Sequence, residues 1–125
     1  MKKTIAYIAH PIAGDVMGNI EKIMEIVREI NLTEPDVVPF APYVIDVLAL
    51  DDDKPEERAI GIDNCIRILM SGIVNELWIY GDRISGGMLA EIEMAFDLSI
   101  PVILMNEDME VPTSIQSKIT EIRFK

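Results

Sequence analysis

A serine, two glycines and a glutamate lie close together in the segment Glu76–Ala95. Ser85 followed by Gly86 and Gly87 is typical of a turn that opens a helix, with the serine as the N-cap. The first N–H groups of a helix have no partner within the helix, and glycines let a ligand approach them closely. We therefore expect this turn, with the N–H of Met88, to form an anion-binding site.

Glu91 is the residue of this segment whose position is unusual. At about 100° per residue, the apolar residues of the expected helix share one arc: Met88, Ile92, Ala95, Phe96 and Leu98. Glu91 falls on the edge of that arc, so its carboxylate is partly desolvated unless a partner binds it. Glu91 is either a helix-margin residue bonded to a backbone group or an arginine, or a nucleophile or acid–base group that faces a pocket.

Composition excludes several classes of function. The chain has 125 residues, half of them hydrophobic, and a formal net charge of −11, which predicts one globular domain over residues 1–125. The negative charge argues against nucleic acids and membranes as partners. One histidine and one cysteine argue against a zinc or iron site, and we expect no cofactor. The apolar run after the N-terminal lysines is short and predicts a strand rather than a signal peptide, so we expect a cytoplasmic protein.

Short apolar segments alternate with helical patterns along the chain. Strands are expected at Thr4–Ala9, Val37–Phe40, Glu76–Tyr80 and Pro101–Met105, with an edge strand at Glu121–Phe124. Helices are expected from Asp15 or Val16 to Ile30, from Pro55 to Met70 or Ser71, from Ser85 to Leu98 and, weakly, from Pro112 to about Thr120. This order predicts an α/β single-domain, flavodoxin/Rossmann-like three-layer sandwich with a four- to five-stranded parallel sheet.

Three loops should meet where the strands end, because parallel sheets bind ligands beyond the carboxyl ends of their strands. They cover residues 10–15, 41–43 and 81–87. Candidates for proton transfer there are His10, Asp15 and Asp82. Each also has a purely structural interpretation: His10 as a loop-packing residue, Asp15 as a helix N-cap and Asp82 as a turn former.

Two segments resemble the nucleoside 2-deoxyribosyltransferase superfamily. Residues 85–91, SGGMLAE, match the S-x-G-x-x-x-E pattern of its deoxynucleoside 5′-monophosphate N-glycosidase branch. Residues 7–14, YIAHPIAG, are similar to the Y-x-x-G-S-I-R-G strand and loop of that branch. Residues 77–95 look closest to small, uncharacterised superfamily members from bacteria and phages.

The resemblance implies an N-glycosidase or 2′-deoxyribosyltransferase acting on deoxynucleosides or their 5′-monophosphates. Glu91 would be the nucleophile that forms a covalent ester, Ser85 would bind phosphate, and Asp82 is a local candidate for protonating the base. The first strand and loop would supply further substrate contacts: Tyr7, His10, Ile12, Gly14 and Asp15. The expected partner is a small nucleoside or nucleotide. We also expect a homodimer or higher homo-oligomer, because the apolar connection Tyr43–Leu50 is suited to a subunit contact.

Four positions depart from the family pattern. Asn75 stands where the family has an aspartate at the start of the third strand; it cannot donate a catalytic proton but remains a candidate for substrate binding. Ala13 replaces an arginine, and His10 and Pro11 replace a glycine and a serine. These changes leave open a non-catalytic nucleotide-binding or sensing module on the same fold. A third hypothesis is an unrelated flavodoxin-like protein, although residues 10–15 lack the Ser- and Thr-rich phosphate loop of flavin-binding members.

Overall fold

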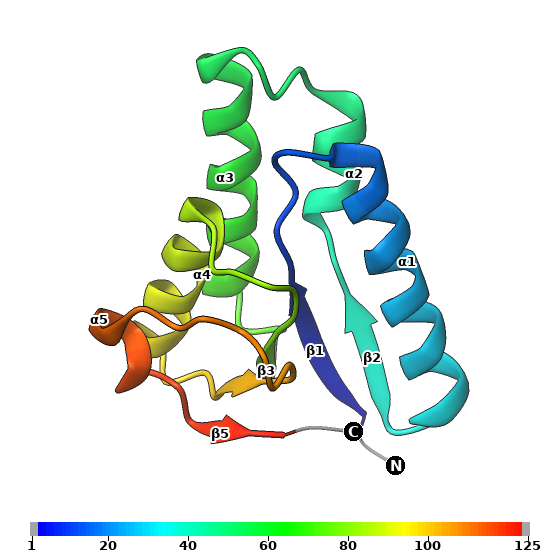
Figure 1. Ribbon diagram of the computed structural model, residues 1–125, viewed down its shortest axis with the longest axis vertical. Helices are drawn as coiled ribbons and strands as arrows, with labels where there is room; N and C mark the ends of the chain where they lie inside the picture. The colour runs from blue at the N-terminus through cyan, green and yellow to red at the C-terminus, as the bar shows by residue number, and fades with distance from the viewer. Residues whose placement is uncertain (1–2, 124–125) are drawn as a thin grey trace.

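The structure, a computed structural model, describes residues 3–123 and contains a parallel sheet with the strand order β2-β1-β3-β4-β5 (Figure 1). Five parallel strands separated by helices confirm the predicted α/β architecture. In chain order the elements are β1 (Thr4–Ala9), α1 (Val16–Thr33), β2 (Val37–Phe40), α2 (Tyr43–Ala49), α3 (Pro55–Met70), β3 (Glu76–Ile79), α4 (Gly86–Asp97), β4 (Val102–Leu104), α5 (Thr113–Gln116) and β5 (Glu121–Ile122).

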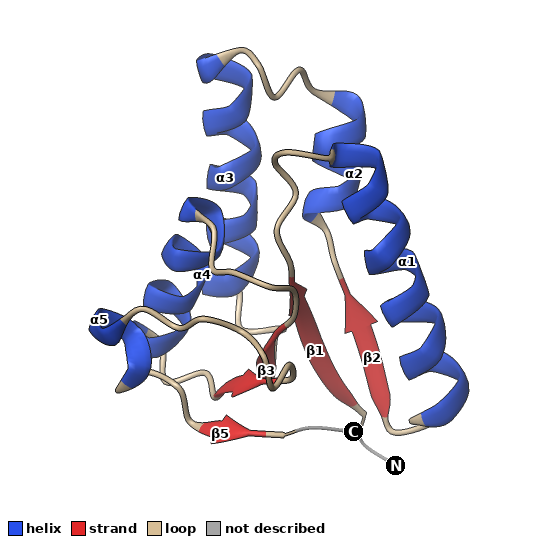
Figure 2. Cartoon of the chain, in the orientation of Figure 1, coloured by secondary structure: helices blue, strands red, loops and turns tan. Residues whose placement is uncertain are grey.

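Helices cover both faces of the sheet. Figure 2 shows α1 on one side of the strands and α3 and α4 on the other. The chain moves from β1 to β2 in one direction and then back across β1 to β3 in the other. Because parallel crossovers are right-handed, this reversal places α1 and α3 on opposite faces. The reversal also creates a switch point between β1 and β3, where the loops after these strands diverge.

The central strands are buried on both faces, which explains their continuous apolar sequences. Tyr7 pairs with Leu77 and Ile8 with Trp78 in the register of β1 and β3. Tyr7 and Leu77 belong to the larger core cluster, which includes side chains of α3 and α4. Ile8 and Trp78 belong to the cluster that contains Ile30 of α1. The alternation thus directs Tyr7 to the α3–α4 face of the sheet.

The helix starts agree with the sequence analysis, because capping is a local property. α3 starts at Pro55 and α4 follows its N-cap Ser85. The long connection contains one short helix, α2. α1 continues past the predicted end at Ile30 to Thr33, and stops because Pro35 cannot extend it and restricts the residue before it.

The last elements are shorter than expected. α5 is a single turn, and β5 ends at Ile122. The part of the predicted edge strand at Phe124 lies outside the described residues. No helix within residues 3–123 is both long and apolar enough to cross a bilayer.

Candidate active site

A cavity of about 130 Å³ opens between α2, α3 and the start of α4. Its lining includes His10 from the loop after β1, Tyr43 at the start of α2, Cys65 of α3 and Glu91 of α4. These segments follow the carboxyl ends of the strands, so the cavity lies at the switch point between β1 and β3, where such sheets bind ligands.

Glu91 is the only acidic side chain that is buried among the described residues, with 8% of its surface exposed. It lies in the second turn of α4, on the same buried face as Met88, Ile92 and Ala95. The hydroxyl of Tyr7, a fully buried residue of β1, donates a hydrogen bond to Glu91 Oε2. Tyr7 thus holds one carboxylate oxygen of Glu91, which lines the cavity. Within residues 3–123 the carboxylate forms no ion pair with a basic side chain.

Burial raises the pKa of Glu91 from 4.5 to about 7, although the hydrogen bond from Tyr7 acts in the opposite direction. Desolvation disfavours the charged carboxylate, whereas a donor stabilises it. Burial, and then the charge of Glu91, raise the pKa of Tyr7 far above its ordinary value, so Tyr7 remains a donor at any pH of interest. A carboxyl group that titrates near neutrality suits a nucleophile or an acid–base catalyst.

Tyr43 and Cys65 complete the inner wall of the cavity. The Tyr43 ring lies 6.0 Å from the Tyr7 ring, and its hydroxyl donates to the carbonyl of Ile8 at 2.6 Å. Burial raises the pKa of the Cys65 thiol to about 11. Because the thiolate is the reactive form, a neutral Cys65 is not a competitive nucleophile at neutral pH. Glu91 is thus the reactive group of this wall.

The start of α4 presents backbone donors to the cavity. Ser85 is the N-cap, and its hydroxyl accepts a hydrogen bond from the N–H of Met88 at 3.3 Å. A Cβ added to Gly86 or Gly87 would meet no atom within 4 Å, so the space beside these residues is open. Ser85 and Gly87 line the cavity, and the arrangement can accept an anion at the helix N-terminus.

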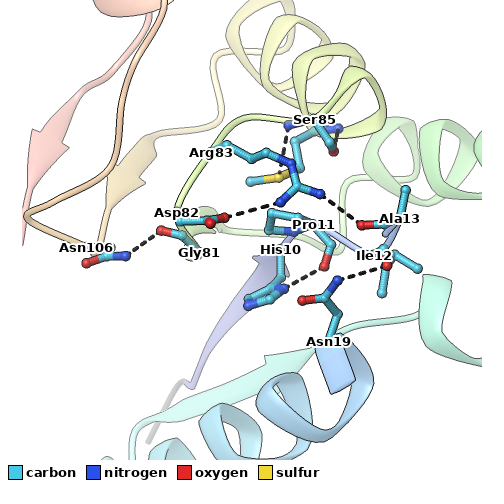
Figure 3. A network of polar contacts seen from close by, with 11 residues as sticks. His10, Pro11, Ile12, Ala13, Asn19, Gly81, Asp82, Arg83, Ser85 and Asn106 are labelled. Carbon is cyan, nitrogen blue, oxygen red and sulfur yellow. Dashed lines mark hydrogen bonds and ion pairs between the residues drawn. The ribbon is translucent and has the colours of Figure 1, made fainter. Parts of the chain in front are cut away.

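Two loops are tied together beside the cavity, as Figure 3 shows. Arg83 donates from Nη2 to the carbonyl of Ala13 at 2.9 Å, which joins the loop after β3 to the loop after β1. Asn106 donates to the carbonyl of Gly81. Gly81 has φ +101°, and a Cβ there would come within 2.5 Å of Pro11, so this crossing of the loops requires glycine.

His10 is buried at the edge of the cavity, and its Nδ1 lies 2.7 Å from the carbonyl of Pro11. A carbonyl only accepts, so this ring nitrogen carries the proton. Burial is the main cause that lowers the pKa of His10, which keeps the ring neutral. Within residues 3–123, no three His, Cys, Asp or Glu side chains come together as metal ligands.

Seven of the predicted site residues meet at the cavity. Tyr7 lies behind Glu91, and the others line the wall: His10, Ile12, Ser85, Gly87, Met88 and Glu91.

Four further predicted residues lie outside the lining. Asp82 points to solvent, with 85% of its side chain exposed, and pairs with Arg83 at 3.4 Å. Asp15 acts as the N-cap of α1, the structural interpretation of this residue. Gly14 lies in the turn before α1, Gly86 is the first residue of α4, and both are exposed. The predicted acid Asp82 is therefore not brought into contact with Glu91.

Asn75 lies at the other end of the sheet. It precedes β3, and its Oδ1 accepts a hydrogen bond from the N–H of Ile5 at 2.7 Å. This is the amino end of the strands, whereas the cavity is at their carboxyl ends. The prediction that Asn75 contacts a substrate in this cavity therefore needs correction, because the length of β3 separates Asn75 from the cavity.

Sequence analysis missed many of the lining residues, among them Asp46, Arg58 and Cys65. They come from α2 and α3, and their place in the cavity depends on how these helices pack together. The available signal was the apolar connection Tyr43–Leu50, which the sequence analysis interprets only as a subunit contact.

Comparisons with known proteins agree on the fold. A family model described as "Domain of unknown function (DUF7768)" matches residues 4–105. The structure is similar to that of a 2-deoxyribosyltransferase from Bacillus psychrosaccharolyticus, with a TM-score of 0.68, 13% identity and coverage of 96% of this chain and 85% of that chain. It is also similar to a conserved protein from Enterococcus faecalis V583, with a TM-score of 0.60, 16% identity and coverage of 97% and 82%. A search of curated proteins gave no match.

Proposed function

We propose a function for this protein from its family, its fold and its cavity. The chain belongs to the family described as Domain of unknown function (DUF7768), and it has the fold of a 2-deoxyribosyltransferase. In our proposal the protein cleaves the N-glycosidic bond of a 2′-deoxynucleoside or its 5′-monophosphate, with Glu91 as the nucleophile. The observation that carries this proposal is the buried carboxylate of Glu91, which Tyr7 holds at the cavity and which has no basic partner within residues 3–123.

The reaction proceeds in two displacements at C1′ of the sugar. A Glu91 oxygen attacks C1′ opposite the base, the bond from C1′ to the base nitrogen breaks, and the base leaves with the bonding electrons and takes up a proton from water. The sugar is then held as an ester of Glu91. Water or a second base then attacks C1′ and gives a proton to the hydroxide left by the first step, the ester bond breaks, and the carboxylate is regenerated. Tyr7 positions Glu91 by holding its other oxygen.

A non-catalytic nucleotide-binding or sensing module is the second candidate. Its support is that the cavity has no second buried carboxyl group among the described residues, and that Asp82 is exposed. Without an acid positioned to protonate it, a nucleobase that is a poor leaving group departs slowly. Such a module would bind the same ligands through the same cavity but would not release a base.

One experiment separates the two candidates. The protein is incubated with a panel of deoxynucleosides and deoxynucleoside 5′-monophosphates, free base is measured by chromatography, and the Glu91 peptide is examined by mass spectrometry for a deoxyribosyl adduct. Base release with an adduct on Glu91 is the expected result. Ligand binding without release would favour the sensing module, and neither binding nor release would contradict both candidates.

A phosphate preference is expected from the start of α4. The space beside Gly86 and Gly87 is open at this helix N-terminus, and the Ser85 hydroxyl adds a polar group without charge. We expect a 2′-deoxynucleoside 5′-monophosphate to bind about tenfold more tightly than its nucleoside, because each charge-assisted hydrogen bond contributes about 1.5–3 kcal/mol. Ser85→Asp should reverse this order, since its carboxylate repels the phosphate.

Calorimetry with one such ligand pair tests the preference. Aspartate is also a good N-cap, so Ser85→Asp should keep α4 folded. Ser117→Asp is the matched control, because it adds the same charge at an exposed position after α5. Equal affinities of wild type for the two ligands would remove phosphate from the proposal and leave a nucleoside as the substrate.

The proposal includes a homodimer or higher homo-oligomer. On α2, Ile45 is 72% exposed and Leu48 is 60% exposed, although both are large apolar residues. Together with Met17 of α1, at 64%, they are apolar surface of the kind that subunit contacts bury.

A further inference from the structure

A second carboxylate, Asp46 of α2, lines the same cavity as Glu91. The helices α2 and α3 approach closely at this point, because a Cβ added to Gly61 would lie 3.7 Å from the Cβ of Asp46. Asn64 of α3 donates a hydrogen bond from Nδ2 to Asp46 Oδ2 at 3.3 Å. Asp46 is therefore held against α3 and is only partly exposed.

Asp46 lies beside Gly61 of α3, about one helical turn from Cys65 along that helix. Gly61, beside Asp46, and Cys65 are four residues apart on α3, which corresponds to a rise of about 6 Å. Burial is the main cause that raises the pKa of Cys65, and the charges of Glu91 and Asp46 add to it, so this thiol lies near both carboxylates. With C1′ of a sugar at Glu91, the part of the cavity wall that includes Asp46 is available to its base.

The hydrogen-bonding capacity of Asp46 favours a donor on the ligand. Asn64 is the one side chain that donates to this carboxylate in the described part of the chain, and it uses Oδ2. The Oδ1 atom can therefore accept a hydrogen bond from a ligand, and a carboxylate cannot donate one when ionised. Asp52 and Glu57 also line the cavity, and within residues 3–123 Arg58 is the only lysine or arginine in the lining. The local charge thus attracts N–H groups and repels carbonyl oxygens.

We propose that Asp46 selects bases with an exocyclic amino group, adenine and cytosine, over the corresponding oxo bases, hypoxanthine and uracil. This inference rests on the proposed function, because it takes the cavity as the site of a nucleobase. The amino group donates to Asp46 Oδ1, whereas the oxygen of an oxo base at that position meets a carboxylate that offers no proton. A site that recognises a polar group in this way discriminates against a ligand that leaves its polar atoms unpaired.

Equilibrium binding of the free bases tests the selection without requiring catalysis. Wild-type protein is titrated with adenine, hypoxanthine, cytosine and uracil, and the dissociation constants are compared within each pair. We expect the amino base of each pair to bind about tenfold more tightly. Asp46→Asn should remove or reverse the preference, because its oxygen can accept from Asn64 while its NH2 group donates to the oxo base. The matched control is Asp63→Asn, which removes one negative charge from the exposed side of α3.

The outcomes separate this inference from the proposed function. Equal affinities within the pairs, or a preference that survives in Asp46→Asn, would overturn the role of Asp46. A preference that is lost in Asp46→Asn but kept in Asp63→Asn supports it, whether or not a base is released from deoxynucleosides. Absence of base release and of a Glu91 adduct contradicts only the catalytic proposal. Absence of any base binding at millimolar concentration overturns the inference.

Discussion

Glu91→Gln is expected to abolish base release from deoxynucleosides, with a loss of at least about a thousandfold. The amide has nearly the same shape and can accept the hydrogen bond of Tyr7 through its oxygen, but it cannot form the ester at C1′. The fold and the cavity should be unchanged, because no packing group is removed. The measurement is the rate of free base formation, with the mass of the residue-91 peptide recorded in parallel.

The matched control is Glu93→Gln, which makes the same change at an exposed position of α4. This variant should release base at the wild-type rate. The wild-type rate should also rise with pH through about 7, because Glu91 attacks only when ionised and burial raises its pKa to that value. Turnover by Glu91→Gln at a rate comparable to wild type would disprove the assignment of the nucleophile.

Glu91→Gln is also expected to stabilise the protein at alkaline pH. The pKa of Glu91 is about 7 in the folded protein and is taken as 4.5 in the unfolded chain. Between these values the folded protein retains a proton that the unfolded chain has lost, so the free energy of unfolding falls as pH rises. The penalty is absent below about pH 4.5 and complete above about pH 7, where it amounts to roughly 3 kcal/mol. Glutamine remains neutral and avoids it.

Urea unfolding of wild type, Glu91→Gln and Glu93→Gln at pH 5 and pH 8 measures this effect. The free energies of unfolding of wild type and Glu91→Gln should differ little at pH 5 and by roughly 3 kcal/mol at pH 8, with the variant more stable. His10 has a lowered pKa and contributes the opposite slope, but it does so equally in every protein compared. A variant that is less stable than wild type at pH 8 would show that burial does not penalise the carboxylate.

The two results together would identify Glu91 as a residue retained at the expense of stability. A purely structural glutamate is expected to stabilise the fold when ionised, through an ion pair or several donors. Among the described residues, Tyr7 is the one side chain that donates to Glu91, and burial raises the pKa of this carboxyl group. Groups that are costly to the fold and lie in a cavity are typical of functional sites.

The order of elements could be predicted from the sequence because it depends on local properties. Apolar strands, the proline at position 55 and the N-cap at Ser85 act over a few residues, and the structure contains each of these elements. The alternation of strands and helices then predicted the parallel sheet, since few topologies accommodate it. The unusual position of Glu91 was also visible, because the face of a helix is determined by its periodicity.

The surroundings of Glu91 were decided by tertiary structure. Tyr7 reaches Glu91 across 84 positions of the sequence, only because β1 and β3 are neighbours and α4 covers that face. Asn75 is nearer to Glu91 in sequence, yet β3 carries it to the other end of the sheet. Asp46 enters the cavity because α2 packs against α3 beside Gly61, and the periodicity of neither helix predicts this contact. Sequence patterns indicate which face of a helix or strand is apolar. The partners of a polar group depend instead on how these elements pack, because packing brings together residues that are distant along the chain.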